Sequence, residues 1–168
     1  MATSISAIAI PPQSEIAKRL PGADFHDCYQ TAIAPTDKSA LSLYLQVAAT
    51  TPAWVNTLMA LRNRIVSLVG LKNLGHLGDF TTSKPADAYR IGDRVGIFSI
   101  RYLSDEEVIL GDSDKHLNVE VSVCKLNGRV AVSTIVHTHN MLGRFYMLFV
   151  APLHRRIVPA TLRQLKSQ

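Results

Sequence analysis

The dipeptide Asn127-Gly128 lies between two runs of alternating apolar and polar residues, and it constrains the fold more than any other feature of the sequence. A two-residue type I′ turn needs a positive φ angle at both central residues, which makes Asn-Gly the strongest short hairpin signal. The runs at 115–126 and 129–139 are therefore predicted to be paired antiparallel strands. In this register Asn118 lies opposite His137.

The register divides the side chains of the hairpin between two faces, because successive residues of a strand point in opposite directions. One face is almost entirely apolar and is predicted to face the core; it carries Leu117, Val119, Val121, Val123, Val130, Val132, Thr134 and Val136. The opposite face is mostly polar and is predicted to be exposed to solvent; it carries His116, Asn118, Glu120, Ser122, Ser133, Ile135, His137 and His139.

Apolar residues at helical spacing, capping residues and turn signals predict the other elements. Pro52 suits the first turn of a helix that Gly70 ends, and Asn140 suits the cap of a last helix. Pro152 and Pro159 should kink or split that last helix. In chain order the predicted elements are a short helix at 14–20, a strand at 23–33, helices at 38–49 and 52–69, strands at 94–103, 106–111, 115–126 and 129–139, and a helix at 141–166.

This order of elements predicts an α+β fold, because the strands follow one another and the helices are grouped apart from them. We expect a curved antiparallel sheet wrapped around a long C-terminal helix, with two shorter helices after the first strand and a cavity between sheet and helix. Residues 1–12 are expected to be a flexible N-terminal arm, and residues 13–168 a single domain of ordinary size.

Composition excludes several classes of protein. The net charge is +5, but the basic residues are scattered rather than gathered in the patch that a nucleic-acid site needs. No apolar run approaches the ~20 residues of a membrane span. The two cysteines do not make a disulfide framework, and no signal peptide is recognisable, so a cytoplasmic protein is expected. No glycine-rich phosphate or dinucleotide loop is present, so no cofactor is expected.

Arg62 is the clearest candidate for a binding residue, because it falls within the apolar arc of its helix beside Leu58. A charge in such a place must be paired or must face a wet cavity. It either extends its head to solvent or a carboxylate, or it anchors an anionic or carbonyl ligand. Trp54, Tyr146 and Phe149 are the other residues expected to contact a ligand.

Three histidines form a candidate metal site, since the hairpin register places His116 opposite His139 and brings His137 beside them. Zinc could use this geometry, with Asp114 or Glu120 as a further ligand. The alternative is an ordinary solvated sheet face, and we expect no bound metal because water competes on an open face.

Some polar residues are expected to be structural. His154 should lie at the surface or satisfy carbonyl groups freed by Pro152. The acidic residues 105–107 lie at a predicted turn and are expected to be solvated.

Three stretches of the sequence carry a resemblance to a known family. The first combines Trp54-Val55, Leu61-Arg62-Asn63 and Gly70-Leu71, and the second is Asp114 to Asn118. The third combines Gly143 to Tyr146 with Ala151 to Arg155. Together they resemble an uncharacterised bacterial family, a domain of unknown function with a helix-grip fold, similar to the START and birch-pollen-allergen (SRPBCC) superfamily. The resemblance covers residues 23–165 and implies a ligand-binding cavity, but it implies no reaction.

We therefore expect the protein to bind a small, mostly apolar ligand in an internal cavity. One alternative is an enzyme of the cyclase or hydratase kind that uses the same cavity. Another is an interaction module, such as a homodimer formed through the polar sheet face. An enzyme needs a titratable group in the cavity. The predicted core face supplies mainly valines, with Arg62 as the one clear ionisable exception, which favours binding.

Overall fold

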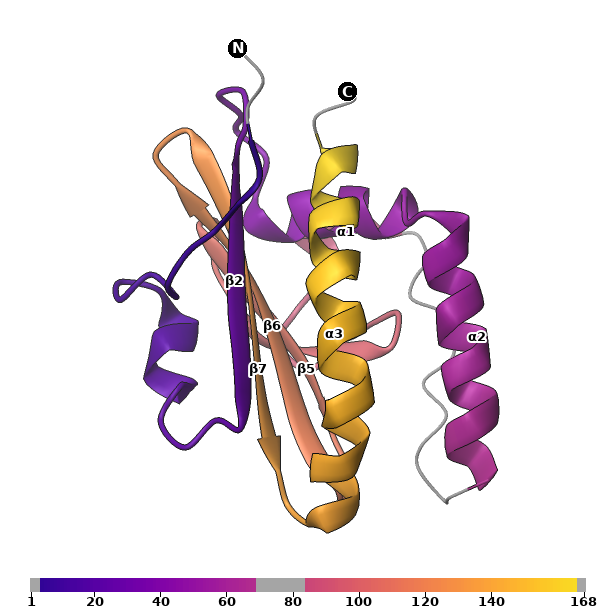
Figure 1. The fold of residues 1–168 in the computed structure, drawn as a ribbon. Helices are drawn as coiled ribbons and strands as arrows, with labels where there is room; N and C mark the ends of the chain where they lie inside the picture. Colours follow the sequence, from indigo (N-terminus) through magenta and orange to yellow (C-terminus); the bar gives the residue numbers. More distant parts are fainter. Residues whose placement is uncertain (1–3, 69–83, 166–168) are drawn as a thin grey trace.

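The computed structural model describes residues 4–68 and 84–165. Within these ranges the chain forms a curved antiparallel sheet of seven strands, in the order β1-β2-β7-β6-β5-β4-β3, and three α-helices of which the last is C-terminal (Figure 1). The predicted α+β class is confirmed. The elements are β1 (Ser6–Ala7), the 3-10 helix η1 (Glu15–Arg19), β2 (Phe25–Ala32), α1 (Ala40–Ala49), α2 (Ala53–Leu68), the 3-10 helix η2 (Ala86–Ala88), β3 (Arg94–Val95), β4 (Phe98–Leu103), β5 (Glu107–Ser113), β6 (Leu117–Leu126), β7 (Arg129–Thr138) and α3 (Met141–Gln164).

The predicted hairpin is present, and its register is confirmed. Asn118 pairs with His137 and Val123 pairs with Val132, so β6 and β7 are matched along their whole length. Gly128 has a φ of 68°, but Asn127 does not have a positive φ, so the two-residue turn is present without the predicted type I′ geometry. Because β7 also pairs with β2, and β6 with β5, this hairpin is the centre of the sheet.

The last helix is capped as predicted, but it is not split. The Asn140 side chain accepts a hydrogen bond from the Gly143 N–H at 3.0 Å, and α3 then continues through both Pro152 and Pro159. Pro152 and Leu148, whose carbonyl loses its helical N–H partner, are both exposed residues, so water can reach this part of the helix. The predicted helix end at Gly70 and most of the predicted loop at 71–93 lie outside the described residues.

The three helices lie on one side of the sheet, which we call the front. α1 contacts β5 and β6, while α3 contacts β2 and β7, so the two helices cover different halves of the front face (Figure 1). The larger hydrophobic core lies under them and includes Leu41, Leu43, Ile100, Leu110, Val123, Val130 and Leu162.

No helix in the described ranges is long and apolar enough to cross a lipid bilayer.

The back of the sheet is covered by the N-terminal segment. β1 pairs with β2, and η1 lies against the strands, so that Ile10 and Ile16 are buried. These two side chains pack with Cys28, Ile109, Ala131 and Ile135 in a second hydrophobic cluster. The expectation of a fully solvated back face is therefore wrong. The arm expected at 1–12 also differs from the structure, because residues 6–10 contribute a strand and a buried side chain.

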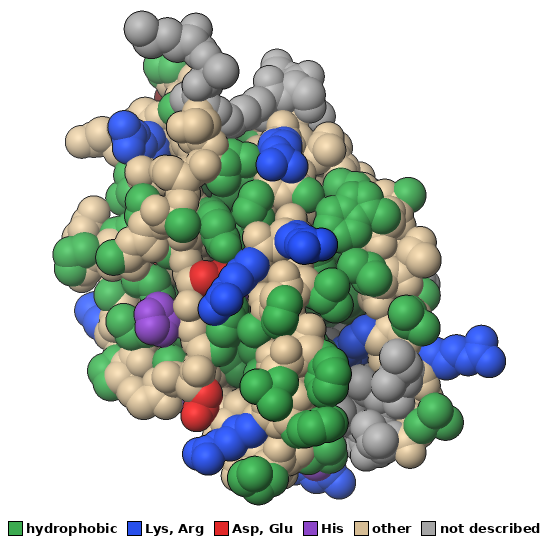
Figure 2. All heavy atoms as spheres, in the orientation of Figure 1, with side chains coloured by type: hydrophobic (Ala, Val, Ile, Leu, Met, Phe, Trp, Pro, Cys, Tyr) green, Lys and Arg blue, Asp and Glu red, His purple; other side chains and the backbone are tan. Residues whose placement is uncertain are grey.

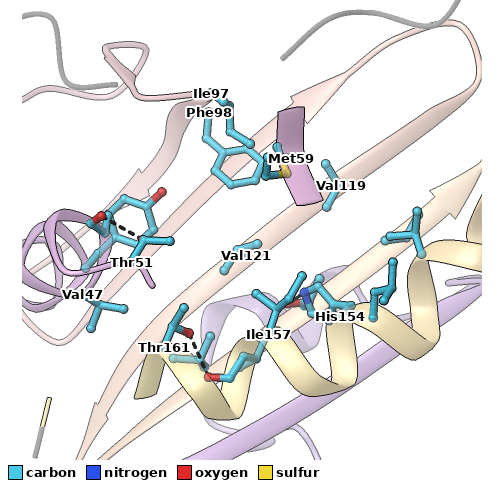
Figure 3. A pocket seen from close by; sticks show the side chains of 18 of the residues that line it. Val47, Thr51, Met59, Ile97, Phe98, Val119, Val121, His154, Ile157 and Thr161 are labelled. Carbon is cyan, nitrogen blue, oxygen red and sulfur yellow. Dashed lines mark hydrogen bonds between the residues drawn. The ribbon is translucent and has the colours of Figure 1, made fainter. Parts of the chain in front are cut away.

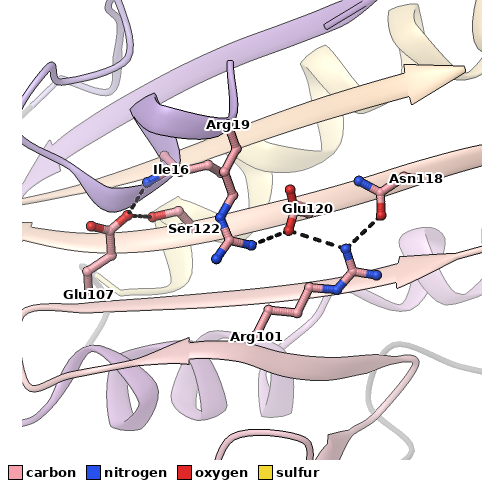
Figure 4. Close-up of polar contacts among 7 residues, drawn as sticks. All are labelled: Ile16, Arg19, Arg101, Glu107, Asn118, Glu120 and Ser122. Atoms are coloured by element: carbon pink, nitrogen blue, oxygen red, sulfur yellow. Dashed lines mark hydrogen bonds and ion pairs between the residues drawn. The ribbon is translucent and has the colours of Figure 1, made fainter. Parts of the chain in front are cut away.

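Two carboxylates attach η1 to the sheet (Figure 4). Glu107 accepts hydrogen bonds from the Glu15 N–H at 2.6 Å, the Ile16 N–H at 3.2 Å and the Ser122 hydroxyl at 2.6 Å. The expectation that Glu107 is solvated is wrong, since only 5% of the residue is exposed.

Glu120 is the second of these carboxylates, and it pairs with two arginines. One is Arg19 at the end of η1, and the other is Arg101 on β4, at 3.2 Å. Arg101 also donates to the Asn118 side chain at 2.6 Å, which extends the polar network along the back face. Each buried charge on this face is therefore matched by hydrogen-bond partners, as burial requires.

Replacing Glu107 by alanine should lower the free energy of unfolding by about 2–4 kcal/mol, because two backbone N–H groups and the Ser122 hydroxyl lose a buried acceptor. Glu107→Gln keeps one carbonyl oxygen and should cost less. The neighbouring Glu106→Ala is the control, since the Glu106 side chain is exposed and forms a surface ion pair with Lys125 at 3.6 Å. Chemical denaturation measures all three variants, and equal losses for Glu107→Ala and Glu106→Ala would contradict the assignment.

The two cysteines, Cys28 and Cys124, are both free and buried. Burial raises the pKa of the Cys124 thiol to about 12 and also raises the pKa of the Cys28 thiol. At about pH 8 a thiol reagent such as dithionitrobenzoate should therefore react with neither group in the folded protein, and with both after denaturation. Rapid reaction of the folded protein would show that the back face opens.

The same pKa shift predicts how stability changes with pH. Above the ordinary thiol pKa of 9.0 the Cys124 thiol ionises in the unfolded chain but stays neutral in the folded protein. The free energy of unfolding should therefore fall as the pH rises above 9.0, and this slope should be smaller in Cys124→Ala. An unchanged slope in that variant would contradict the proposed cause.

Candidate functional site

The front face of the sheet and the three helices line a partly open cavity of about 280 Å³ (Figure 3). β6 and β7 supply its floor, because their register turns the predicted core face toward the helices. The floor consists of Leu117, Val119, Val121, Val123, Val132, Thr134 and Val136. The helices supply most of the remaining wall, with side chains that include Leu43, Val47, Leu58, Met59, Met147, Val150, Ile157 and Leu162. A wall of this composition favours an apolar occupant.

Two hydroxyl groups of the wall are already bonded to their own helices or helix ends. Thr51 donates to the carbonyl of Ala48 at 2.8 Å, and Thr161 donates to the carbonyl of Val158 at 2.8 Å (Figure 3). These threonines therefore present mainly their methyl groups to the cavity. The polarity of the cavity is concentrated at a few other side chains.

His154 is the polar group between α3 and the sheet. Its Nδ1 lies 3.0 Å from Asp27 Oδ2 on β2, and its Nε2 lies 3.3 Å from Thr134 Oγ1 on β7. The imidazole also packs edge-on against the Phe25 ring, with 5.8 Å between the ring centroids. Phe25, Thr134 and His154 all line the cavity. The expectation of a surface role for His154 is therefore wrong.

Arg62 and Tyr146 form a second polar contact in the wall, between α2 and α3. Arg62 Nε donates to the Tyr146 hydroxyl at 2.8 Å, and Arg62 Nη1 donates to Asn63 Oδ1 at 2.8 Å. The Arg62 Cζ also lies 5.4 Å from the centroid of the Tyr146 ring. Both residues line the cavity, as expected of ligand contacts, and the guanidinium has polar partners that offset its partial burial.

Trp54 and Phe149, the other two expected ligand contacts, do not line the cavity. Trp54 is 45% exposed and Phe149 is 63% exposed, and the Phe149 ring instead contacts Phe145 edge-on. The outward face of α3 carries several further exposed hydrophobic side chains, and Figure 2 shows such side chains beside basic ones over this helix. Apolar residues thus occur on both sides of α3, and hydrophobicity alone did not identify the side that faces the sheet.

The three histidines predicted to be neighbours have separate partners. His116 is buried, and its Nδ1 lies 2.9 Å from the Asn140 amide nitrogen. His137 Nε2 lies 3.2 Å from the Pro21 carbonyl oxygen, while His139 is exposed and donates its backbone N–H to the His116 carbonyl at 2.8 Å. In the described parts of the chain no group of three His, Cys, Asp or Glu side chains is arranged to hold a metal ion.

His116 contacts the start of α3 at two points: its imidazole lies beside the capping residue Asn140, and its backbone carbonyl lies close to Gly143. A Cβ atom on Gly143 would lie 2.3 Å from the His116 carbonyl oxygen, so this close approach of helix to sheet requires glycine. The Asp114 carboxylate accepts from the N–H groups of His116 and Leu117, at 2.7 and 3.0 Å, and thereby orders the turn before β6. The contacts of His116 thus bring the stretches at 114–118 and 143–146, two of the three that carry the family resemblance, side by side in the structure.

One signal in the sequence could have identified the His154 contact. In β2 the side chains of Phe25, Asp27 and Tyr29 share one face, and Asp27 pairs directly with Thr134 of β7. An acidic residue among aromatic ones on a core-facing strand needs a buried partner. The candidates are the polar residues of the helix that covers this strand, and His154 is one of them.

The sequence profile of one family matches residues 19–161; its description is "Protein of unknown function (DUF2867)". No curated protein and no solved structure was found to match the chain. The matched range contains β2 to β7, α1, α2 and nearly all of α3, and hence almost the whole cavity wall. The chain therefore belongs to the family of proteins of unknown function DUF2867.

Proposed function

We propose that the protein binds a small, mostly apolar molecule in the cavity between the sheet and its helices. The observation that carries this proposal is the row of valines from β6 and β7 that lines about 280 Å³ of unfilled space. Protein interiors are normally close-packed, and unfilled space costs stability. A cavity of this size in the centre of the fold is therefore best explained by a ligand.

The volume indicates the size of the ligand. A dry apolar cavity of roughly 150 Å³ binds benzene, so a cavity of about 280 Å³ suits a body of about two fused rings or a short branched chain. Arg62 and Tyr146 are proposed to contact the ligand at the α2–α3 side, since both line the cavity there. Trp54 and Phe149 are not part of this proposal.

The helix-grip architecture, with a distant relation to START-like proteins, is part of the same proposal. Its support is the arrangement of a long C-terminal helix across a curved antiparallel sheet, with two shorter helices after β2 (Figure 1). In such an arrangement the sheet and the last helix leave a space that side chains do not fill.

An enzyme that works in the same cavity is a second candidate. The requirement is a titratable group that faces the cavity. His154, which contacts Asp27, meets this requirement in addition to Arg62. Arg62 is therefore not the one clear ionisable group of the cavity, as expected from the sequence, because His154 lines it as well. An interaction module on the back face has less support, because the N-terminal segment covers part of that face.

Binding of 1-methylnaphthalene, an apolar two-ring molecule, tests the proposed function. Val121→Phe adds a ring inside the cavity and should weaken binding by about tenfold or more, while the free space absorbs the added volume and the fold remains stable. Leu148→Phe adds similar bulk on the exposed side of α3 and should leave the affinity unchanged. Isothermal titration calorimetry measures both variants. Equal affinities of both variants and the wild type, or no binding by the wild type, would contradict the proposal.

A further inference from the structure

The contact between Asp27 and His154 fixes what His154 can offer to a ligand. An ionised carboxylate only accepts hydrogen bonds, so the 3.0 Å contact places a hydrogen on Nδ1 of the imidazole. In a neutral imidazole the other nitrogen is then an acceptor. In this neutral tautomer the lone pair of Nε2 points toward Thr134, a residue that lines the cavity.

Thr134 does not use this lone pair fully. Its Oγ1 lies 3.3 Å from Nε2, longer than a well-formed hydrogen bond. Thr134 is itself buried and lines the cavity, so a ligand that reaches Nε2 also meets this hydroxyl. A ligand with its own O–H group can donate to Nε2 and bond to Thr134 at the same point.

Asp27, His154 and Thr134 lie in the order of a nucleophilic triad, but their surroundings do not suit acyl transfer. Such a reaction needs free backbone N–H groups that stabilise an oxyanion beside the nucleophile. Thr134 lies in the middle of β7, which pairs with Asp27 of β2 on one side and with Val121 of β6 on the other. The backbone groups of β7 at this point are therefore used in the sheet. The contact is better suited to recognition of a hydroxyl group.

The charge next to Nε2 also discriminates between ligands. The cation of the cavity wall, Arg62, is bonded to Tyr146 and Asn63 at the α2–α3 side, whereas the charged group bonded to His154 is Asp27. Asp27 supplies a carboxylate whose second oxygen, Oδ1, is buried without a partner in the described structure. A ligand carboxylate bound at Nε2 would add a second negative charge beside it in an apolar wall, which is unfavourable. A neutral hydroxyl group adds no charge and satisfies the acceptor.

We propose that the ligand of this cavity is an alcohol or a phenol with an apolar body, and that its hydroxyl group donates a hydrogen bond to His154 Nε2. This inference rests on the proposed function, because it names the chemical class of the molecule that the cavity binds. His154 is the recognition residue, and Asp27 is the positioning residue that sets its tautomer.

Three naphthalene derivatives of similar shape test the inference by calorimetry: 1-naphthol, 1-methylnaphthalene and 1-naphthoate. The wild type should bind 1-naphthol about tenfold more tightly than 1-methylnaphthalene, the effect of one buried hydrogen bond, and should bind 1-naphthoate most weakly. In His154→Leu the preference for 1-naphthol should fall below about twofold. Leu148→Phe, on the exposed side of α3, is the control and should retain the preference.

A measurement on the wild type avoids dependence on the folding of a variant. In protein labelled with ¹⁵N-histidine, 1-naphthol should move the Nε2 signal of His154 and leave its Nδ1 signal nearly unchanged, while 1-methylnaphthalene should move neither. Equal affinity for these two compounds, or tighter binding of 1-naphthoate, would overturn the inference and leave the proposed function standing. Failure of all three compounds to bind would overturn both.

Discussion

The pairing of β6 with β7 is the constraint on which both sides of the molecule depend. A shift of β6 by one residue against β7 would turn the side chains of β6 to the opposite faces, because strand side chains alternate with a period of two. With β7 in place, Val121 would leave the cavity and Glu120 would enter it. The turn at Asn127-Gly128 prevents this exchange by fixing which residues are opposite each other. The cavity and the back-face network are thus two consequences of one register.

The two faces of the sheet are stabilised by different means. The back face combines a small hydrophobic cluster with carboxylates whose oxygens are matched by N–H and guanidinium donors. The front face has the larger core, and beside this core the three helices and the sheet leave the cavity. This contrast indicates where the chain tolerates unfilled volume. A fold held together by its back face and by the larger core can keep a cavity on its front face.

Much of the fold could be predicted from the sequence because its signals are local. The alternation in β6 and β7, the Asn-Gly turn and the Asn140 cap each depend on a few neighbouring residues. The burial of Glu107 could not be predicted in this way, since its donors belong to η1, far away along the chain. The cavity role of His154 likewise appears only once α3 packs against β2. Phe149 was misplaced because α3 carries apolar residues on both its inner and outer sides.

The central claim is that the front of the sheet holds an accessible apolar cavity, and xenon tests it most directly because xenon enters such cavities without needing a polar contact. Methyl NMR spectra of valine-labelled protein would be recorded under increasing xenon pressure. The structure predicts shifts for Val121, Val132 and Val136, which line the cavity, and none for Val55 and Val95, which are buried outside it. Equal shifts in both groups, or no shifts at all, would contradict the account.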